Sequence, residues 1–288
     1  MLINRSKTFD ELRSKDRNQE DFPIGSFFIP RSIRQSVHTY YRYARIADDI
    51  ADNSNLSAIQ KINILNQLES VIQGDASRIE LLDKEAFEAA NSIGNHLRSQ
   101  KLDLSLATDL LIAFRLDSEN TQYNTWADLV DYCRFSACPV GRFMLALHGE
   151  TDASAESDAL CISLQILNHI KDLRYDYINL QRIYIPQDWL NHDQCSSDDF
   201  SEMKTTAKLK ITLMRMLNQT DYLLASADNL PKTIKSPRLA AEAKLCLSLA
   251  KKLSHRLKNE DPLTHTVKLS RYDWISSGLR SFIYLVRQ

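Results

Sequence analysis

Chain breakers are scarce along this sequence, and their scarcity limits the folds that it can adopt. The 288 residues include only 6 glycines and 7 prolines, well below the ordinary usage of about 7% and 5%. Apolar residues recur at helical spacing along nearly the whole chain, and no stretch alternates as a half-buried strand does. So few breakers in so long a chain favour long helices joined by short turns. We therefore predict an all-α fold.

A single helical bundle accounts for the whole chain. No repeat, low-complexity stretch or linker divides it, and 43% of its residues are hydrophobic, enough for a well-buried core. We predict one all-α domain over residues 1–288, with residues 1–20 forming a poorly ordered N-terminal segment. The expected helices span residues 31–53, 56–73, 82–99, 103–117, 125–135, 139–149, 154–178, 203–227, 236–258 and 265–285.

The charge balance and the lack of several signals exclude some classes of protein. The formal net charge is −1, so no overall field attracts nucleic acid. No apolar run reaches the roughly 18 residues that span a bilayer, and the charged N-terminus does not resemble a signal peptide. The five cysteines lack CxxC spacing, and the seven histidines form no zinc-binding pair. We interpret the chain as cytoplasmic, with reduced thiols, no nucleic-acid partner and no stable protein partner.

Acidic residues crowd one face of the first expected helix. In YRYARIADDIAD, which begins at Tyr41, a rotation of 100° per residue places Tyr41, Arg45, Asp48 and Asp52 within about 60° of one another. Asp49 lies about 100° off this stripe. The neighbouring residues are apolar, which favours a helix inside a bundle. Buried carboxylates need a compensating partner.

A second helix repeats the pattern. In LQILNHIKDLRYDYINLQRIYIPQ, the side chains of Gln165, Asn168, Asp172 and Asp176 fall on one face at offsets close to those of the first stripe. Each stripe therefore ends in two aspartates about one turn apart. His169 and Tyr177 flank the second stripe, and packing or a surface position is the simpler interpretation of those two.

Two such faces, opposed across a cavity, predict a metal site. Mg²⁺ prefers oxygen ligands, keeps several waters and is usually shared with substrate phosphates. The faces would then hold several Mg²⁺ ions with a diphosphate between them. Arg45, Lys171, Arg174 and Arg182 lie on or near the faces and would add positive charge for the phosphate oxygens.

A simpler interpretation exists for the first acidic face. Runs of charge are usually solvated surfaces, and the three aspartates could pair with Arg42 and Arg45 at an exposed helix end. The matched second stripe favours the metal and diphosphate, because two such stripes rarely arise together by chance.

These segments resemble a known enzyme family. YARIADDIAD and QILNHIKDLRYDYINLQRIYIP are similar to the two aspartate-rich motifs of the squalene/phytoene synthases, and the resemblance extends over about residues 21–271. The second motif matches the family pattern N-x-x-x-D-x-x-x-D, then R-x-Y-x-P, at Asn168, Asp172, Asp176, Arg182, Tyr184 and Pro186. The resemblance implies a helical bundle of the isoprenoid synthase type around a central apolar cavity, and a prenyl diphosphate as substrate.

The resemblance also implies roles for individual residues. Two or three Mg²⁺ ions would be held by Asp48, Asp52, Asp172, Asp176 and, off the stripe, Asp49. The catalytic residues would be Tyr41, Arg45, Asn168 and Arg182. The residues that bind substrate would be Phe22, Gln165, Tyr184, Lys268 and Arg271, of which the last two would close the site from the C-terminal end. An aromatic cavity lining would come from Phe22, Phe27, Tyr41, Phe135 and Phe143, although core packing is the simpler interpretation of each.

Three segments indicate a subgroup of the family. NQEDFPIGSFFIPRSIRQSVHTYYRYARIADDIAD, LVDYCRFSACPVGRFMLALHG and DPLTHTVKLSR resemble the bacterial hydroxysqualene synthases of hopanoid biosynthesis. That resemblance implies a lyase that ionises presqualene diphosphate, rearranges the cation and captures it with water, without NADPH. Where condensing members of the family usually carry a Ser-Lys-Ser-Phe-like segment, this chain has Gln19-Glu20-Asp21-Phe22. The missing lysine puts condensation in doubt and fits a single preformed C30 diphosphate.

Two other functions remain alternatives. One is a synthase that condenses two prenyl diphosphates to presqualene diphosphate, squalene or phytoene. The other is a non-catalytic helical scaffold whose acidic patches bind Mg²⁺. For either enzyme, a lipid substrate and product are compatible with loose contact at the inner face of the membrane through an apolar rim, without an anchor.

Overall fold

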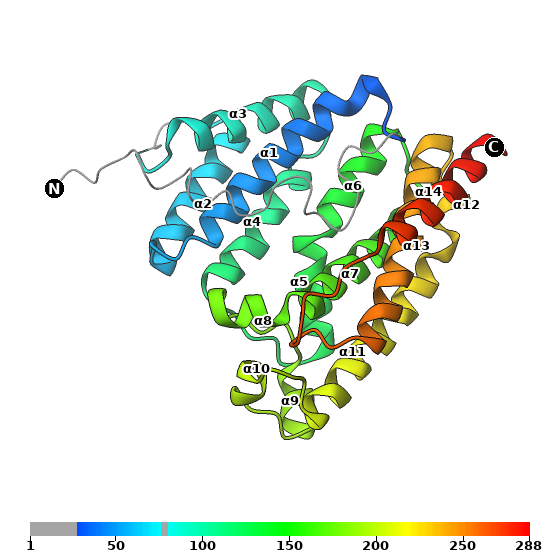
Figure 1. Ribbon diagram of the computed structural model, residues 1–288. Helices are drawn as coiled ribbons and strands as arrows, with labels where there is room; N and C mark the ends of the chain where they lie inside the picture. The colour runs from blue at the N-terminus through cyan, green and yellow to red at the C-terminus, as the bar shows by residue number, and fades with distance from the viewer. Residues whose placement is uncertain (1–27, 76–79) are drawn as a thin grey trace.

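The structure is built of helices. The computed structural model describes residues 28–75 and 80–288, and these residues form no strand (Figure 1). The all-α prediction is therefore confirmed. The longer helices are α1 (Arg34–Ala51), α2 (Ala58–Gln73), α3 (Lys84–Ser99), α4 (Ser105–Ser118), α5 (Trp126–Ser136), α6 (Cys138–Leu147), α7 (Ser154–Lys171), α11 (Ala207–Ser226), α13 (Pro237–Asn259) and α14 (Arg271–Val286). The short helices are η2 (Arg31–Ile33), α8 (Leu173–Tyr175), η3 (Asp176–Leu180), α9 (Gln187–His192), α10 (Asp198–Ser201), η4 (Ala227–Asn229) and α12 (Leu230–Thr233).

Side-chain caps fix where several helices begin. Ser57 heads a reciprocal capping box at α2, and Ser270 heads another at α14. The periodicity predicts a start at residue 265. Because the cap lies at Ser270, α14 begins at Arg271 instead. Helix α2 ends at Gly74, whose φ of 94° is in the left-handed region that glycine tolerates. The short helices α9, α10 and α12 were not predicted, because periodicity is a weak signal over so few residues.

The helix that carries the second acidic face ends earlier than predicted. Residues 154–178 were expected to form one helix, but α7 stops at Lys171 and is followed by α8 and then by η3, which is a π-helical turn. Asp176 is the first residue of that turn, and its carbonyl oxygen accepts a hydrogen bond of 3.1 Å from the Arg182 amide. Turns of this kind are rare and frequently lie at functional sites. This one changes the backbone geometry at the last carboxylate of the stripe.

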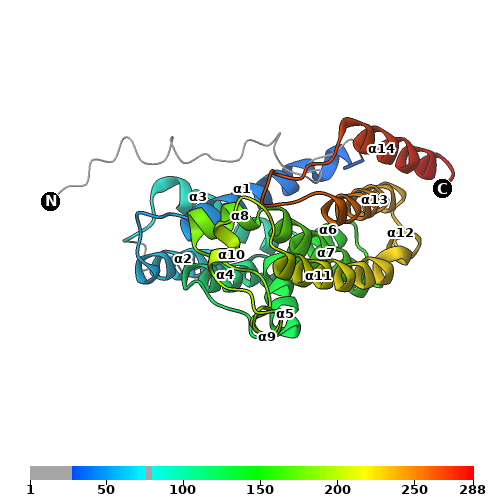
Figure 2. The same cartoon turned by 60° about the horizontal axis from the view of Figure 1, so that its bottom comes forward.

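Two hydrophobic cores hold the helices together. One lies among α1 to α4, where Tyr43, Leu68 and Ile93 are fully buried. The other lies among α5, α6, α7, α11 and α13, where Ile166 and Leu253 are fully buried. In Figures 1 and 2, α2, α3 and α4 lie at one end of the molecule, and α13 and α14 lie at the other. The helices that carry the two acidic faces, α1 and α7, thus belong to different cores.

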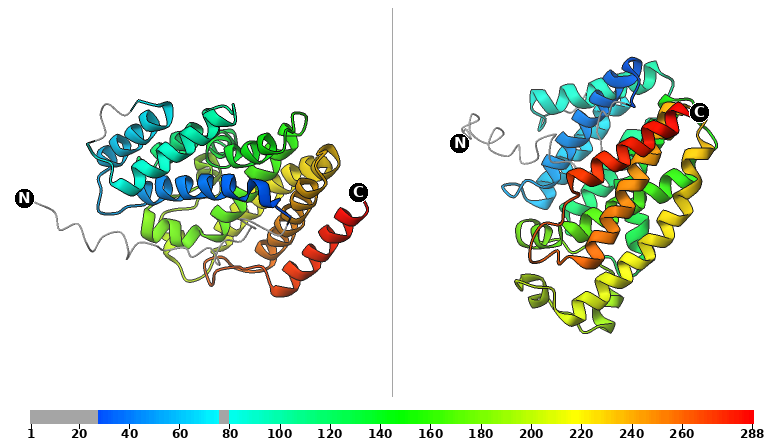
Figure 3. Two further views of the ribbon diagram at one scale, coloured as in Figure 1. Left: turned by 90° about the horizontal axis from the view of Figure 1, so that it is seen from above. Right: turned by 45° about the vertical axis from the view of Figure 1, so that its right-hand side comes forward.

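Helix α14 lies at the edge of the bundle. It runs along α13 (Figure 3), and a smaller cluster that includes Phe28, Ala241, Leu249 and Trp274 fills the contact. None of the helices formed by the described residues is long and apolar enough to cross a membrane.

Two glycines test the packing of this fold. A Cβ at Gly94 in α3 would lie 2.6 Å from the carbonyl oxygen of Ile72, so α2 and α3 approach as closely as they do only because the side chain is missing. At Gly278 in α14, a Cβ would meet nothing within 4 Å. We expect Gly94→Ala to lower the free energy of unfolding by about 1–3 kcal/mol. We expect Gly278→Ala to raise it by about 0.5–1 kcal/mol. Urea unfolding checks both, and equal midpoints for the two variants would contradict this packing.

Candidate active site

The two acidic faces line one cavity. It has a volume of about 280 Å³ and is bounded by α1 on one side and by α7, η3 and the segment after it on the other. The sequence-predicted residues in its wall are Tyr41, Arg45, Asp48, Asp52, Gln165, Asn168, Asp172, Asp176, Arg182 and Tyr184. The structure therefore brings together the residues of both motifs. Their chemical roles stay predictions.

Three other predicted residues do not line this cavity, and a fourth lies outside the described residues. Asp49 is absent from its wall, and its carboxylate accepts a hydrogen bond of 2.8 Å from Arg45. Lys268 lies in the segment before α14, and Arg271 is the first residue of that helix, so neither reaches the cavity wall. Phe22 lies outside the described residues, as does the whole segment in which the lysine is missing.

Arginine compensates the acidic face of α1. Arg45 donates from Nη1 to Asp48 Oδ2 at 2.6 Å and from Nη2 to Asp49 Oδ1 at 2.8 Å. Burial raises the pKa of Asp49, and Arg45 counters part of that rise. The simpler interpretation, in which the aspartates of α1 pair with Arg42 and Arg45, is thus correct for Arg45. It is wrong for Arg42, which lies 3.7 Å from carboxylates on α3.

Arg182 ties the end of α1 to the second motif. Its guanidinium donates to Asp52 Oδ1 at 2.6 Å, to the carbonyl of Ala51 at 2.9 Å and to the carbonyl of Asp117 at 3.0 Å. Burial works to lower the pKa of Arg182, but the carboxylates of Asp117 and Asp52 and the Tyr184 hydroxyl outweigh it and hold the pKa above its usual value. The side chain is therefore a permanent cation that positions Asp52 at the cavity.

A buried carboxylate that the sequence analysis missed supports this arrangement. Asp117, near the end of α4, accepts hydrogen bonds from the hydroxyls of Tyr184 at 2.7 Å and Tyr132 at 2.9 Å. Burial raises the pKa of Asp117, while Arg182 and the two hydroxyls act against that rise. Asp117 and Tyr132 both line the cavity. Nothing in the local sequence marks Asp117, because an acidic residue near a helix end is common.

A lysine and an imidazole lie beside the second acidic face. Lys171 is buried, and its Nζ lies 3.3 Å from Asp172 Oδ2. The His169 ring stacks on Tyr184 with 3.6 Å between centroids, and its Nδ1 lies 3.9 Å from Asp176 Oδ2. The interpretation of His169 as a packing residue fits its burial and its stacking on Tyr184, and the side chain also lines the polar cavity.

A second cavity adjoins the first and is lined mainly by aliphatic side chains. Its volume is about 360 Å³, and α6, α7, α12 and α13 supply most of its wall. Ser136, Val140, Gln165 and Asn168 line both cavities and so form the seam between them. The apolar cavity was predicted, but Phe135 and Phe143 do not line it and pack in the two cores, which was the simpler interpretation of each. Tyr41 lines the polar cavity, and Phe22 and Phe27 lie outside the described residues.

The wall of the polar cavity suits a hydrated cation that is shared with an anion. Among the described residues, no three carboxylate, imidazole or thiol groups stand close enough to hold a metal ion on their own. Mg²⁺ does not need such a cage, since it keeps waters and takes one or two carboxylates together with phosphate oxygens. Two pairs of aspartates on facing walls fit that requirement. The buried Asn168 Oδ1 and Ser136 Oγ have no hydrogen-bond partner, as expected for atoms that face a ligand or water.

Comparison with known sequences agrees with this geometry. Residues 15–273 match the family described as "Squalene/phytoene synthase". A hydroxysqualene synthase of Sinorhizobium fredii is 35% identical over 263 residues, covering 91% of this chain and 87% of its own. One of Rhodopseudomonas palustris is 34% identical over 267 residues, covering 92% and 89%.

Solved structures share the fold. The squalene synthase HpnC of Alicyclobacillus acidocaldarius superposes with a TM-score of 0.69 at 28% identity, covering 82% of this chain and 87% of its own. A ligand-bound dehydrosqualene synthase gives a TM-score of 0.71 at 20% identity, covering 91% and 90%. The helical isoprenoid synthase fold is common to all of them. On the family match and the relatives above 30% identity, the chain belongs to the squalene/phytoene synthase family.

Proposed function

We propose that the protein is a hydroxysqualene synthase, a Mg²⁺-dependent lyase that converts presqualene diphosphate and water to hydroxysqualene and diphosphate. The observation that carries the proposal is the seam, where an acid-walled cavity and a mainly aliphatic one share four lining residues. A prenyl diphosphate has the same two halves, a charged head and a long apolar chain. The names of the relatives at 34–35% identity support the choice within the family.

The polar cavity would hold the diphosphate. When bound, Mg²⁺ supplies a Lewis acid that stabilises the charge growing on a departing diphosphate. Asp48 and Asp52 on one wall and Asp172 and Asp176 on the other are the residues that would hold two or three ions. Arg45, now paired with Asp48, would be available to the phosphate oxygens when a metal takes over that carboxylate. Asp49 stays behind this face as the second partner of Arg45.

The aliphatic cavity would hold the carbon chain. A carbocation survives only where few nucleophiles reach it, and Leu160, Leu164 and Leu239 present hydrocarbon there. The reacting carbon would then lie at the seam, beside the departing diphosphate. Water captures the rearranged cation, so the reaction needs no hydride and no NADPH.

The rival enzyme is a prenyltransferase that condenses two prenyl diphosphates. It would need a second diphosphate held near the first, and the family's lysine for that purpose is replaced in the segment Gln19-Glu20-Asp21-Phe22. A Mg²⁺-binding scaffold is the weaker rival, since it has no use for an aliphatic cavity beside its carboxylates. These functions differ in the substrate that each one uses: one presqualene diphosphate, two prenyl diphosphates, or none. We place the reaction in the cytoplasm.

Removing one carboxylate tests the metal role. Asp172→Asn keeps the shape of the side chain but removes its charge, so we expect diphosphate release to fall at least 100-fold, in line with the several kcal/mol that a catalytic metal supplies. The matched control is Asp131→Asn, which alters an exposed carboxylate on α5 that pairs with Arg134. Circular dichroism should give the same helicity for both. Wild-type rates in Asp172→Asn, or in the unaltered enzyme with excess chelator, would contradict the role.

The product tests the proposed reaction. With Mg²⁺, presqualene diphosphate should give hydroxysqualene and diphosphate at a rate that NADPH does not change. In ¹⁸O-labelled water, the new hydroxyl should carry the label, because solvent supplies its oxygen. Farnesyl diphosphate alone should react slowly or not at all. Efficient condensation of farnesyl diphosphate, or squalene formed only with NADPH, would assign the protein to the rival synthases.

A further inference from the structure

The outer face of α14 is apolar. Six large hydrophobic side chains of this helix remain 41–76% exposed, at intervals of mostly three or four residues, which places them on one face: Tyr272, Ile275, Leu279, Phe282, Ile283 and Val286. The opposite face, with Asp273, Ser277 and Ser281, is buried against the bundle. Scattered exposed hydrophobic residues need no explanation, but a contiguous apolar face usually marks an interaction surface.

Positive charge flanks this face. At 100° per residue, Arg271 lies along one edge of the apolar stripe, and Arg280 and Arg287 lie along the other. All three are exposed. The single acidic residue of α14, Asp273, is buried and accepts a hydrogen bond of 2.9 Å from Arg256. The exposed side of α14 therefore presents hydrocarbon and guanidinium groups and no carboxylate.

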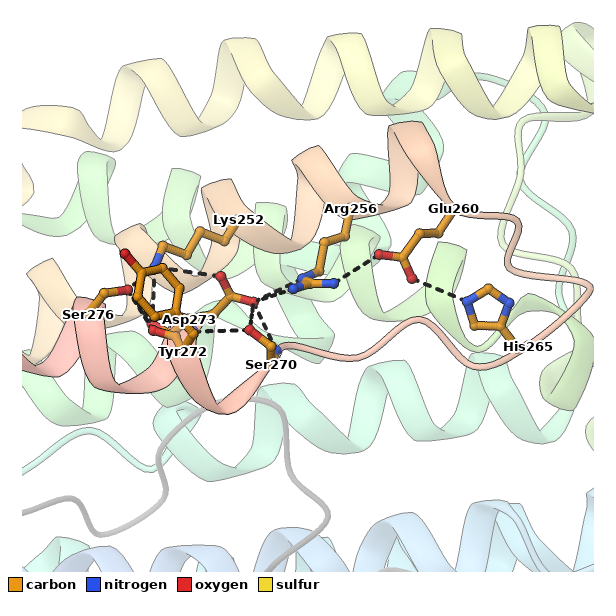
Figure 4. A network of polar contacts seen from close by, with 8 residues as sticks. All are labelled: Lys252, Arg256, Glu260, His265, Ser270, Tyr272, Asp273 and Ser276. Atoms are coloured by element: carbon orange, nitrogen blue, oxygen red, sulfur yellow. Dashed lines mark hydrogen bonds and ion pairs between the residues drawn. The ribbon is translucent and has the colours of Figure 1, made fainter.

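A groove beside α14 extends the basic edge. It is lined by α13 and α14 and contains Lys251, Lys252, His255, Arg256 and Arg280. Figure 4 shows the ion pairs of its two carboxylates. Asp273 pairs with Lys252 and Arg256, and Glu260 pairs with Arg256 and His265. Lys251 is paired with Asp228. Arg280 has no such partner among the ion pairs of the described residues, and it stands where the groove meets the apolar face.

We propose that α14 docks on a membrane that contains anionic lipids. Its apolar face would enter the boundary between headgroups and acyl chains, and Arg271, Arg280 and Arg287 would lie at the level of the phosphates. A second copy of the chain fits this face less well. It would bring its own arginines against these, and α14 offers no exposed carboxylate to meet them. This proposal rests on α14 itself and not on the proposed reaction.

Docking there would place the aliphatic cavity close to the bilayer. Leu239, Ala243 and Cys246 of α13 line the cavity, while Leu245 and Ser248 of the same helix face α14. One helix therefore separates the proposed membrane surface from the space that would hold a lipid.

Vesicle sedimentation of the full chain tests the proposal. We expect binding to vesicles of phosphatidylcholine with 30% phosphatidylglycerol, weaker binding to phosphatidylcholine alone, and a loss of affinity at high salt. Leu279→Glu and Phe282→Glu should each weaken binding at least about tenfold, because each places a charge in the apolar face. The matched control is Ile59→Glu, at an apolar residue on α2 that is 73% exposed.

Three results would overturn the proposal. The unaltered chain could fail to sediment with anionic vesicles, or Ile59→Glu could weaken binding as much as Phe282→Glu does. The third is a dimer in light scattering that Phe282→Glu dissociates while no vesicle binds, which would make a second copy the partner. Equal binding to both kinds of vesicle would overturn the role of the arginines.

A separate observation concerns the seam between the two cavities. Ser136 ends α5 and lines both cavities, and its Oγ is buried without a hydrogen-bond partner. Asn168 Oδ1 on α7 is also buried without a hydrogen-bond partner, and Asn168 lines the same two cavities. A buried hydroxyl and a buried carbonyl oxygen left unpaired where the two cavities meet are costly unless something bonds to them.

We infer that Ser136 and Asn168 position the water that ends the proposed reaction, and this inference rests on the proposed function. A water between them could donate to Asn168 Oδ1 and bond to the Ser136 hydroxyl, which leaves a lone pair for the cation. Ionisation breaks the bond between carbon and the diphosphate oxygen. The water oxygen then forms the new bond to carbon, and its lost proton passes to the released diphosphate. Ester and water thus become alcohol and protonated diphosphate.

The share of alcohol among the products tests Ser136. Ser136→Ala and Ser136→Val remove the hydroxyl, so we expect the ratio of hydroxysqualene to hydrocarbon products to fall at least about tenfold. Ser136→Thr keeps the hydroxyl and should keep the ratio. A structural role alone would lower the rate without changing this ratio.

The possible failures are distinguishable. If the unaltered enzyme makes no alcohol, the proposed function fails. If it makes alcohol and Ser136→Ala gives the same product ratio, only the inference about Ser136 fails. Loss of diphosphate release in Ser136→Ala would also overturn the inference, because the hydroxyl would then serve ionisation.

Discussion

Carboxylates that face each other inside a helical bundle must be compensated, and this requirement shapes the centre of the molecule. Arg45 bonds two of the three aspartates at the end of α1, and Arg182 bonds the third while it also holds the backbone of α1 and α4. Arg182 is itself buried, so removing Asp52 would leave its charge uncompensated, whereas the three aspartates are each 36% exposed and keep part of their hydration. The arginines thus let the acidic walls exist before any ligand arrives.

Around these pairs, the polar and apolar halves of the centre serve different tasks. The acid-walled cavity can gather cations around an anionic head, while the second cavity is lined mainly by aliphatic side chains, with the Glu242 carboxylate and the thiols of Cys161 and Cys246 also in its wall. Their border carries the unpaired oxygens of Ser136 and Asn168. An enzyme that must protect a cation and then admit one water needs such a border. The exposed face of α14 would let the same molecule meet a lipid where that lipid resides.

Much of this arrangement was predictable from local pattern, and the rest depends on tertiary contacts. Helical periodicity predicted the long helices, and the stripes predicted which side chains share a face, because both follow from 3.6 residues per turn. The π-helical turn at Asp176 shifts the backbone where no sequence signal marks it. Asp117 and His169 gain their significance from Tyr184, which is distant in the chain from Asp117. The burial of Ser136 Oγ likewise depends on which helices meet around it.

Diffraction from crystals soaked with Mn²⁺ and inorganic diphosphate tests the central claim most directly. Mn²⁺ takes the same oxygen ligands as Mg²⁺, and its anomalous signal locates each ion without reference to activity. The account predicts Mn²⁺ peaks between the Asp48 and Asp52 wall and the Asp172 and Asp176 wall, bridged by diphosphate, with Arg45 turned from Asp48 toward a phosphate oxygen. Diphosphate bound elsewhere, such as in the basic groove beside α14, with no Mn²⁺ between the acidic walls, would contradict it.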